Sequence, residues 1–464
     1  MNKGFTFEQA QGYVSRIGKK GSILGLETMT LLMKEMGDVQ NQVPTIHIAG
    51  TNGKGSVSAY LTFILKEAGY RVGRYSSPAV FDNLEIITVD GQKITEVQYA
   101  EGVWNVKLAI ESMVEQGYPE PTAFELETAL AFWYFKKVNC DIAIIECGMG
   151  GETDATNVIA KPVAEILMPV SLDHMGFLGD TIEKIARVKA GIVKTGTQVI
   201  VAKQECPDTL RLVVEEQAER KQAKAIYCKE FQNVSYGLEQ TSFSYTTTNG
   251  NEYSNIVISM PGTFQPDNAA PALECVEILK RAGFRIDNEQ VRRGLLLTRW
   301  PGRFEQICKE PKVYLDGCHN PGAAKRLCQT IEYHFTNKKI IYIIGVLADK
   351  DYREEIRILG PLASEIFTVT PNVPRGLSGE VLAEVVREEY PGTVTYVSDF
   401  QKAIELAMKS ARNETEEKMY SKESKEVKEV KEVKEVNEDK EGVVIVFGSL
   451  SFLKDIRDGI HNEK

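Results

Sequence analysis

The sequence predicts an α/β fold in two parts, a larger one built on a mostly parallel sheet and a smaller one on its C-terminal side. Short apolar segments alternate with amphipathic segments of helical spacing between residues 43 and 202, which is typical of a parallel sheet covered by helices. A glycine-rich loop follows the first of these apolar segments. A second series of apolar strands begins after a Pro-Gly step at residues 301–302, and it indicates a separate domain.

The larger domain is expected to span residues 1–298. Hydrophobic periodicity predicts strands over residues 45–49 and 143–146 and helices over residues 57–68, 125–137 and 267–282. Residues 225–260 are different, because Tyr- and Thr-rich segments alternate around an Asn249-Gly250 turn. This stretch predicts a small antiparallel sheet within the larger domain.

The smaller domain is expected to span residues 299–464 and to be Rossmann-like, with helices between its strands. Residues 297–303 are the candidate linker that leads into it. Strands are expected over the apolar segments 313–316, 340–346, 366–370 and 443–447. Residues 412–441 are low in complexity, and we interpret them as a solvated insertion, with an interaction tail as the alternative.

Length and composition limit the possible functions. A chain of 464 residues is too long for one core and suggests two or three domains. The net charge of −10 argues against nucleic acid or an anionic membrane as a partner. The eight cysteines lack metal-like spacing, the first residues do not resemble a signal peptide, and no apolar run is long enough to cross a membrane. We therefore expect a cytoplasmic protein, and we expect it to be a monomer.

The glycine-rich loop, His47-Ile-Ala-Gly-Thr-Asn-Gly-Lys-Gly-Ser56, is the most informative segment of the chain. It lies between an expected strand and an expected helix, where glycines let backbone N–H groups surround phosphate oxygens. Lys54 adds a full positive charge to the partial charge of the helix N-terminus. The strict P-loop pattern is not met, because Ile48 occupies the first glycine position and Gly55 separates Lys54 from the serine. A glycine-rich turn with an incidental lysine is the competing interpretation.

A carboxylate and a second glycine-rich segment follow a later strand. Residues 141–146 form an apolar strand pattern that ends in Glu146, as a Walker B element does. Such strand ends lie at the edge where ligands bind in open α/β sheets. Directly afterwards come Gly148-Met-Gly-Gly151, whose glycines allow close backbone approach, and Asp154-Ala-Thr-Asn157. The two motifs together predict a P-loop nucleotide-binding domain.

These blocks, in this order, resemble the Mur ligase superfamily in its folylpolyglutamate synthase and dihydrofolate synthase branch. The resemblance rests on G-T-N-G-K-G-S at the loop, D-A-T-N after the second strand, K-A-G-I in a later helix, and P-G-R-F-E and D-G-C-H-N-P beyond the linker. Matching blocks extend from residue 21 to residue 321. The resemblance implies that ATP, the co-substrate, is bound by the loop residues Thr51, Asn52, Gly53, Lys54, Gly55 and Ser56.

The resemblance also implies two Mg²⁺ ions. Ser77, which follows the strand beyond the helix of the loop, would hold the first ion, although Ser76 could compete for this role. Glu146 and His174 would hold the second ion. Histidine is an unusual ligand for Mg²⁺, which prefers oxygen, so spacing alone leaves a structural role for His174 equally open. Family members usually carry His after the proline that follows this serine, whereas this chain has Ala79.

Lys189 stands in the K-A-G-I block, where the resemblance implies a lysine carbamylated by CO₂. On composition alone, Lys189 is an ordinary cation near a helix end closed by Gly191. A buried lysine has a lowered pKa and can be neutral enough to react with CO₂. Its carbamate would supply anionic oxygens for a metal ion or a nearby group.

Four further residues complete the implied site for ATP and the amino acid. Asn268 would read the adenine edge, because an amide offers both a donor and an acceptor, although it also suits a helix start. Arg303 would meet phosphate, where its fork geometry helps, and Asp316 would face ribose or Arg303. His319 occupies the position associated with the incoming amino acid, and with Lys54 and Lys189 it forms the expected catalytic set.

Three segments resemble the blocks of the family that face the pterin and the folate. Phe124 in the second segment could stack on an aromatic ring, and it could equally be a core residue. The family usually has a basic and an apolar residue before Asp154, where this chain has Glu152 and Thr153. The expected contacts are Gly21, Ser22, Ile23 and Leu24, then Thr122, Ala123, Phe124 and Glu125, and finally Thr153, Asp154 and Ala155.

The implied reaction is ATP-dependent amide formation. The carboxylate of a reduced folate or of dihydropteroate would attack the γ-phosphate to give an acyl phosphate, and L-glutamate would then displace phosphate.

Three other classes of protein compete with this prediction. A peptidoglycan-precursor Mur ligase would need a further domain before the loop, and only 46 residues precede His47. Another P-loop NTPase would not need the K-A-G-I block, and a non-catalytic ATP-binding scaffold would be expected to lack Lys54 or Glu146.

Overall fold

The computed structural model describes residues 4–19, 21, 25–413 and 442–461. The chain forms two compact units. The first comprises the chain up to Tyr236 together with Gln240–Ser259 and Gln265–Trp300, and the second comprises Gly237–Glu239, Met260–Phe264 and the chain from Pro301 onward. Residues 22–24 and most of the low-complexity insertion, residues 414–441, lie outside the described residues.

The first unit is built on an eight-stranded sheet with the strand order β4-β3-β2-β5-β1-β6-β7-β8. The six strands β2, β5, β1, β6, β7 and β8 run parallel to one another. The remaining two, β3 and β4, form an antiparallel edge beside β2. The predicted mostly parallel sheet is therefore confirmed. The strands are β1 (Thr45–Ala49), β2 (Val72–Tyr75), β3 (Ile87–Val89), β4 (Gln92–Lys93), β5 (Ile142–Glu146), β6 (Ala164–Leu167), β7 (Gln198–Val201) and β8 (Lys224–Tyr227).

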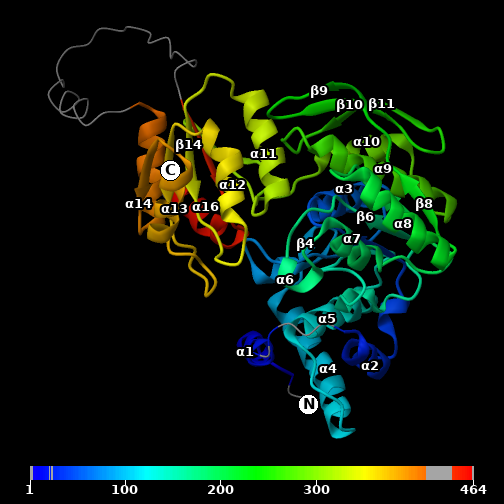
Figure 1. The fold of residues 1–464 in the computed structure, drawn as a ribbon. Helices are drawn as coiled ribbons and strands as arrows, with labels where there is room; N and C mark the ends of the chain where they lie inside the picture. Colours follow the sequence, from blue (N-terminus) through cyan, green and yellow to red (C-terminus); the bar gives the residue numbers. More distant parts are fainter. Residues whose placement is uncertain (1–3, 20, 22–24, 414–441, 462–464) are drawn as a thin grey trace, which may run out of the picture. The chain divides into compact units, whose positions relative to one another are not determined.

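Helices cover both faces of this sheet (Figure 1). Ala143 and Ile145 of β5 join a core with residues of α1, α2, α4 and α5. Side chains alternate along a strand, so Ile144 and Glu146 face the side of α3, which contacts β1, β2 and β5. The helices of the unit are α1 (Phe7–Gly18), α2 (Glu27–Glu35), α3 (Lys54–Glu67), α4 (Glu96–Glu115), α5 (Ala123–Lys137), α6 (Met175–Leu178), α7 (Ile182–Ala190), α8 (Pro207–Lys221), α9 (Gln265–Arg281) and α10 (Asn288–Leu297).

The helix starts follow from local chemistry. Helix α3 begins at Lys54, three residues before the apolar periodicity begins, because Gly53 at its N-cap has a φ of +84° that turns the chain into the helix. Helix α5 begins after a capping box in which Thr122 and Glu125 bind each other's backbone N–H groups. Thr181 caps α7 through its side chain.

The predicted small antiparallel sheet is present, but it is shorter than expected. Its three strands have the order β11-β10-β9, with bounds Glu252–Ile258, Thr241–Thr246 and Gln232–Ser235. The expectation was wrong for residues 225–227, because β8 pairs in parallel with β7 and extends the large sheet. The alternating pattern of β8 looks the same in either sheet, and only its pairing partner distinguishes them.

The second unit contains a six-stranded sheet with the order β12-β13-β17-β14-β15-β16. Only β12 runs antiparallel among these described strands. Four strands were predicted, and β12 and β16 were missed because polar side chains interrupt their apolar pattern. The strands are β12 (Glu305–Lys309), β13 (Lys312–Leu315), β14 (Ile340–Ile344), β15 (Glu365–Thr368), β16 (Thr393–Tyr396) and β17 (Val443–Phe447), and the helices are α11 (Pro321–His334), α12 (Tyr352–Leu359), α13 (Gly379–Glu389), α14 (Phe400–Ala411) and α16 (Leu453–His461).

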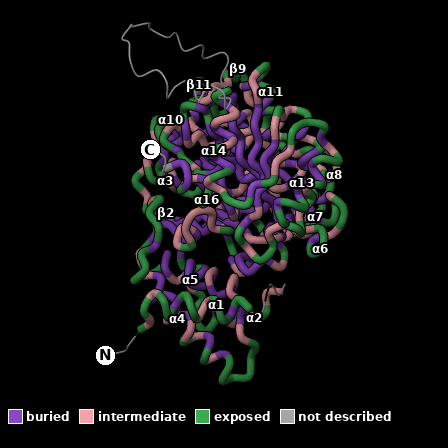
Figure 2. Tube along the Cα trace, turned by 90° about the vertical axis from the view of Figure 1, so that its left-hand side faces the viewer, coloured by how far each residue is buried: buried purple, intermediate pink, exposed green. Residues whose placement is uncertain are grey.

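The buried residues concentrate on the central strands of each sheet (Figure 2). Every residue of β1, β5, β14 and β17 is buried. Strands that are buried along their whole length in this way are typical of parallel sheets covered on both faces. Among the described helices, none combines the length and the apolar character that crossing a membrane requires.

Candidate active site

The glycine-rich loop turns tightly from the end of β1 into α3. At Gly53 an added Cβ would lie 2.5 Å from Oδ1 of Asn268, and at Gly50 it would lie 2.6 Å from the Cβ of Met168, so both positions require glycine. The loop is anchored by the Thr51 amide, which donates to the Pro169 carbonyl at 2.8 Å. The backbone of the loop is thus held in one conformation at the N-terminus of a helix, as phosphate binding requires.

Lys54 points back across the loop that it belongs to. Its Nζ donates to the carbonyl oxygens of Gly50 and Thr51 at 3.1 and 3.2 Å. The same nitrogen lies 3.8 Å from Oε1 of Glu146, and both side chains are largely buried, with 15% and 8% exposed. The structure therefore brings together the lysine and the Walker B-type carboxylate that the sequence predicted for one site.

Lys189 lies directly behind this loop. Its Nζ donates to the Gly50 carbonyl at 3.0 Å, the same oxygen that Lys54 binds. Burial, and then the neighbouring Lys54, lowers the pKa of Lys189 to about 7. No carboxylate of the described chain forms an ion pair with its amine. A buried amine of this kind is partly neutral at physiological pH.

The close approach predicted for the glycines after β5 is made to a helix. A Cβ at Gly151 would lie 2.7 Å from the backbone carbonyl oxygens of Val188 and Lys189, so glycine is required for this loop to rest on α7. The backbone amide of Glu152 donates to the Val188 carbonyl at 2.8 Å. These contacts fix the position of Lys189 relative to the loop after β5.

Asp154, an expected folate contact, holds its own loop together. Its two carboxylate oxygens accept from the amide of Met149 at 2.8 Å and the hydroxyl of Thr156 at 2.6 Å. Thr156 in turn lies 2.8 Å from Nε2 of His47. Burial raises the pKa of Asp154 and lowers the pKa of His47 to about 3, so this network contributes a neutral imidazole beneath the phosphate loop.

The three predicted magnesium ligands lie at or just after the C-terminal ends of three strands of the large sheet. Ser77 follows β2 and Glu146 ends β5, and these strands are paired, while His174 follows β6 beyond β1. Ser77 is partly exposed and Ser76 is buried, which makes Ser77 the more accessible of the two candidates. Nε2 of His174 lies 3.8 Å from Oδ2 of Asp173, and its backbone has a φ of +51°. In the described part of the chain, no three His, Cys, Asp or Glu side chains gather to form a metal cluster by themselves.

Asn268 lies in the first turn of α9 and contacts the phosphate loop. It is buried, and its amide donates to Oε1 of Gln265 at 3.2 Å. Its Oδ1 rests against Gly53, where any side chain would displace it. The same Gln265 leaves its Nε2 buried without a hydrogen-bond partner among the described residues. The helix start and the loop thus meet, as they must if Asn268 is to contact a nucleotide bound there.

Arg303, Asp316 and His319 lie together in the second unit. The carboxylate of Asp316 accepts from the backbone amides of Phe304 and Cys318, both at 2.8 Å. Burial raises the pKa of Asp316, and the nearby Arg303 guanidinium opposes this rise. The Nδ1 atom of His319 lies 2.7 Å from the Gly317 carbonyl, and the residue is partly exposed.

Comparison with known proteins identifies the family. Residues 48–276 match the Mur ligase middle domain, and residues 302–416 match the Mur ligase glutamate ligase domain. The dihydrofolate synthase/folylpolyglutamate synthase of Bacillus subtilis is 35% identical over 376 residues, which cover 80% of this chain and 86% of that protein. The chain belongs to the folylpolyglutamate synthase and dihydrofolate synthase family. It is accordingly an ATP-dependent ligase with the Mur ligase fold.

Solved structures of this family agree with the fold over almost the whole chain. Folylpolyglutamate synthase of Mycobacterium tuberculosis complexed with ADP and AMPPCP superimposes with a TM-score of 0.83 at 26% identity, covering 98% of both chains. Escherichia coli FolC in complex with DHPP and ADP gives a TM-score of 0.79 at 26% identity, covering 99% of this chain and 98% of that one. Both neighbours bind adenine nucleotides.

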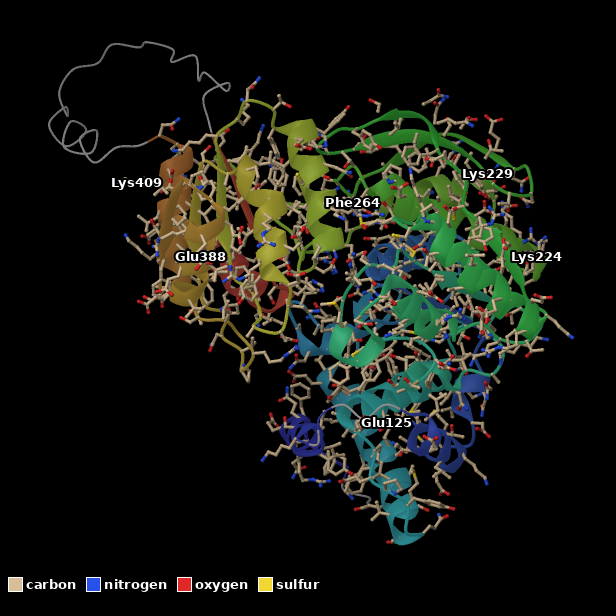
Figure 3. The ribbon with its side chains drawn as sticks, viewed as in Figure 1. Glu125, Lys224, Lys229, Phe264, Glu388 and Lys409 are labelled. Atoms are coloured by element: carbon tan, nitrogen blue, oxygen red, sulfur yellow. The ribbon has the colours of Figure 1, made fainter. Side chains whose placement is uncertain are left out.

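The segments expected to face the pterin have clear structural roles in this member of the family. Thr122 and Glu125 form the capping box of α5, with the Thr122 amide 2.7 Å from Oε2 of Glu125; Glu125 is labelled in Figure 3. The ring of Phe124 packs on Gly148, where a Cβ would come within 2.5 Å of it. Thr153 and Ala155 flank Asp154 in its loop. Of the expected contacts near the N-terminus, Gly21 belongs to the described residues, whereas Ser22, Ile23 and Leu24 lie outside them.

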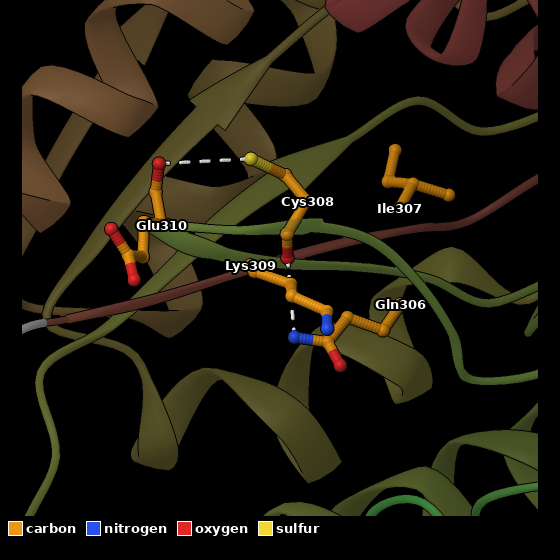
Figure 4. A pocket seen from close by; sticks show the side chains of 5 residues that line it. All are labelled: Gln306, Ile307, Cys308, Lys309 and Glu310. Carbon is orange, nitrogen blue, oxygen red and sulfur yellow. Dashed lines mark hydrogen bonds between the residues drawn. The ribbon is translucent and has the colours of Figure 1, made fainter.

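A hollow on the second unit is separate from these residues. It is lined by Gln306–Glu310 of the β12–β13 hairpin (Figure 4). The Gln306 amide donates to the Cys308 carbonyl at 3.2 Å, and the Cys308 thiol lies 3.7 Å from the Glu310 carbonyl. These polar groups bind one another within the hairpin, and none of them was predicted as a site residue.

Sequence reasoning missed two residues beside the phosphate loop, Arg74 and Trp300. Arg74 is buried in β2, and its guanidinium lies over the Trp300 ring, 4.4 Å from the centroid. Nε1 of Trp300 would lie 2.6 Å from a Cβ placed on Gly55. A charged residue within the apolar strand Val72–Tyr75 was the available signal for Arg74.

Proposed function

We propose that the enzyme joins L-glutamate to the carboxylate of a folate, and also of dihydropteroate, through an acyl phosphate. The observation that carries the proposal is the convergence of Lys54, Glu146 and Lys189 on one phosphate loop in a Mur ligase fold. The loop serves phosphoryl transfer to a carboxylate. The glutamate ligase domain then provides the second half of the reaction, attack by an amine.

Phosphoryl transfer depends mainly on positioning and charge. The backbone amides from Gly53 to Ser56 at the start of α3 would bind the β- and γ-phosphates of ATP. Lys54 would then exchange its two carbonyl contacts for phosphate oxygens, since an ammonium ion binds an anionic oxygen more strongly than a neutral one. Asn268 would hold the adenosine end beside Gly53, and we propose Arg303 and Asp316 as further nucleotide-binding residues.

The site residues also suit two Mg²⁺ ions. Glu146 supplies an anionic oxygen at the loop, 3.8 Å from the ammonium of Lys54. Ser77 would hold one ion, and Glu146 with His174 would hold the other. When bound, the ions would neutralise the charge that develops on the transferring phosphoryl group.

Lys189 is suited to carbamylation. Its amine is buried, is held by a single carbonyl oxygen, and has a pKa near 7, so a neutral nucleophile is available at physiological pH. The nitrogen of the neutral amine would bond to the carbon of CO₂ and release one proton, which converts the neutral amine into an anionic carbamate. That anion would lie beside Lys54 and would turn the repulsion between the two side chains into attraction.

The acceptor and the amino acid have less direct support than ATP. The family names include both folylpolyglutamate and dihydrofolate synthase, and DHPP is bound by the Escherichia coli neighbour. Phe124, at the start of α5, presents an aromatic ring beside the loop after β5, where a pterin could stack. His319 is partly exposed and would receive the incoming L-glutamate.

A turnover assay tests the proposed function. ADP release should require ATP, Mg²⁺, L-glutamate and one acceptor together, and labelled glutamate should enter the product in equal amount. Each acceptor is offered separately, a reduced folate in one reaction and dihydropteroate in the other. ADP release that proceeds at full rate without any acceptor would contradict the proposal, because it would indicate an ATPase.

We also propose that the enzyme acts in the cytoplasm as a monomer. All eight cysteines are free thiols, which suits a reducing compartment. Light scattering coupled to size exclusion measures the mass directly, and a value near 51.8 kDa is expected.

A further inference from the structure

Arg74 is a buried cation that the mechanism described above does not use. It occupies the middle of β2, opposite Ile144 of β5, and only 7% of its surface is exposed. Its Nε is buried without a partner, and no described residue forms a hydrogen bond or an ion pair with its guanidinium. A buried charge is strongly unfavourable unless it is paired, so an unpaired guanidinium here calls for an anion that binds to it.

The position of Arg74 relative to Glu146 indicates where that anion would lie. Arg74 is in register with Ile144 in the parallel neighbour strand, so Arg74 and Glu146 lie on the same face of the sheet, two residues apart along the strands. Glu146 and then Glu85 attract the guanidinium, but neither lies within ion-pair distance of it. Burial lowers the pKa of Arg74 to about 10, so the group stays charged at physiological pH.

Trp300 holds the guanidinium in place. The Arg74 side chain lies over the indole ring, 4.4 Å from its centroid, in an arrangement that stabilises a cation by cation–π attraction. The nitrogen side of the same indole rests against Gly55 in the first turn of α3, where a Cβ would come within 2.6 Å. Trp300 is therefore a positioning residue that ties Arg74 to the phosphate loop.

We propose that Arg74, supported by Trp300, binds the carboxylate of the acceptor at the point where it receives the phosphoryl group. The choice over a phosphate of ATP rests on what each anion already has, because the loop amides and Lys54 serve the phosphates and no cation is assigned to the acceptor carboxylate. The backbone of Arg74 lies on β2, which is separated from β1 by β5 and Glu146. Its guanidinium reaches the indole that also contacts Gly55, so an anion bound by Arg74 would lie beside the phosphate loop, where the acceptor carboxylate must receive the phosphoryl group.

The inference rests on the proposed ligase function, and steady-state kinetics separate the two. In the Arg74→Gln variant, the KM for the acceptor should rise at least tenfold, while the KM for ATP stays within about twofold. Arg74→Lys should recover part of the loss, because it keeps a cation but lacks the planar fork. The matched control is Arg71→Gln, at an exposed arginine just before the same strand, and it should behave as wild type.

Trp300 provides a readout that does not depend on turnover. The chain has three tryptophans, so a Trp104→Phe/Trp133→Phe protein reports on Trp300 alone. Titration with folate should change its fluorescence to a plateau, and folate with its carboxylates converted to amides should leave it unchanged. Trp300→Phe should keep a low acceptor KM, and Trp300→Leu should raise it as Arg74→Gln does.

Several results would overturn the inference while leaving the ligase function intact. If wild type ligates glutamate but Arg74→Gln keeps its acceptor KM and only melts earlier, Arg74 merely offsets the charges of Glu146 and Glu85. If the KM for ATP rises instead, the anion is a phosphate of the nucleotide. If Arg74→Gln fails to fold, the fluorescence of the protein with Trp300 as its single tryptophan decides the question. An equal response of that fluorescence to folate and to its amide would overturn the inference. Absence of ligation by wild type with every acceptor would instead overturn the proposed function.

Discussion

The buried amine of Lys189 predicts a distinctive dependence of stability on pH. A lysine in the unfolded chain has a pKa of 10.5, and in the folded chain the pKa of Lys189 is about 7. At about 1.4 kcal/mol per pKa unit, protonating this amine in the folded protein costs about 5 kcal/mol relative to the unfolded chain. Between pH 7 and 10.5 the unfolded chain binds more protons than the native one, so the stability of wild type rises with pH over that window.

The Lys189→Met substitution removes the titrating group and keeps an apolar stem of similar length. In buffer free of CO₂, the variant should unfold at a higher temperature than wild type at pH 6.5, by an amount that corresponds to at most about 5 kcal/mol. The difference should shrink steadily as the pH rises and approach zero near pH 10. The measurement is a series of melting curves from pH 6.5 to 10, analysed for the transition of the unit that contains the phosphate loop.

Two controls isolate the effect. Lys184→Met, at an exposed lysine of the same helix, should show no pH-dependent gain, because that amine stays in water. Added bicarbonate should stabilise wild type and not Lys189→Met, since only the lysine can form a carbamate. A constant difference at all pH values, or a Met variant that is less stable at pH 6.5, would refute the account of Lys189 as a desolvated amine.

The other predictions concern the phosphate loop. Lys54→Ala should lower ATP turnover at least a hundredfold with little change in melting temperature, as measured by ADP release and calorimetry, whereas near-normal turnover would contradict the assignment of the loop. Glu146→Gln should raise the Mg²⁺ concentration needed for half-maximal activity at least tenfold, because a neutral amide is a poorer ligand, and an unchanged titration would show a structural role. Gly53→Ala should destabilise the protein by about 1–3 kcal/mol and weaken AMPPCP binding measured by calorimetry, because its φ of +84° and the contact with Asn268 exclude a side chain.

The parts of the fold that depend on local sequence could be predicted. The strands at residues 45–49, 143–146 and 443–447 are mostly apolar and end at glycine or acidic residues, so their position follows from local sequence alone. The helix start at Lys54 was placed three residues late, because Gly53 begins the helix through its backbone conformation rather than through apolar periodicity. The assignment of β8 to the large sheet depends on pairing with β7, which no local pattern reveals.

In the candidate site, too, the residues placed by local sequence could be predicted, and those placed by contacts between distant segments could not. Lys54 and Glu146 could be placed at one site because each follows a parallel strand, and the structure puts their charged atoms 3.8 Å apart. The burial of Lys189 could not be read from its helix, since it depends on contact with the loop after β5, which Gly151 permits. Arg74 and Trp300 were missed for a related reason. They are 226 positions apart in sequence, and only the fold brings the guanidinium over the indole.

The central claim is that the phosphate loop activates a carboxylate as an acyl phosphate before L-glutamate attacks it. The most direct test uses an acceptor whose carboxylate carries oxygen-18, incubated with ATP, Mg²⁺, L-glutamate and the wild-type enzyme. One labelled oxygen should appear in inorganic phosphate for each amide bond formed, and Lys54→Ala should form neither product. Amide formation with unlabelled phosphate would contradict the claim, because the acceptor oxygen would then never have been bonded to phosphorus.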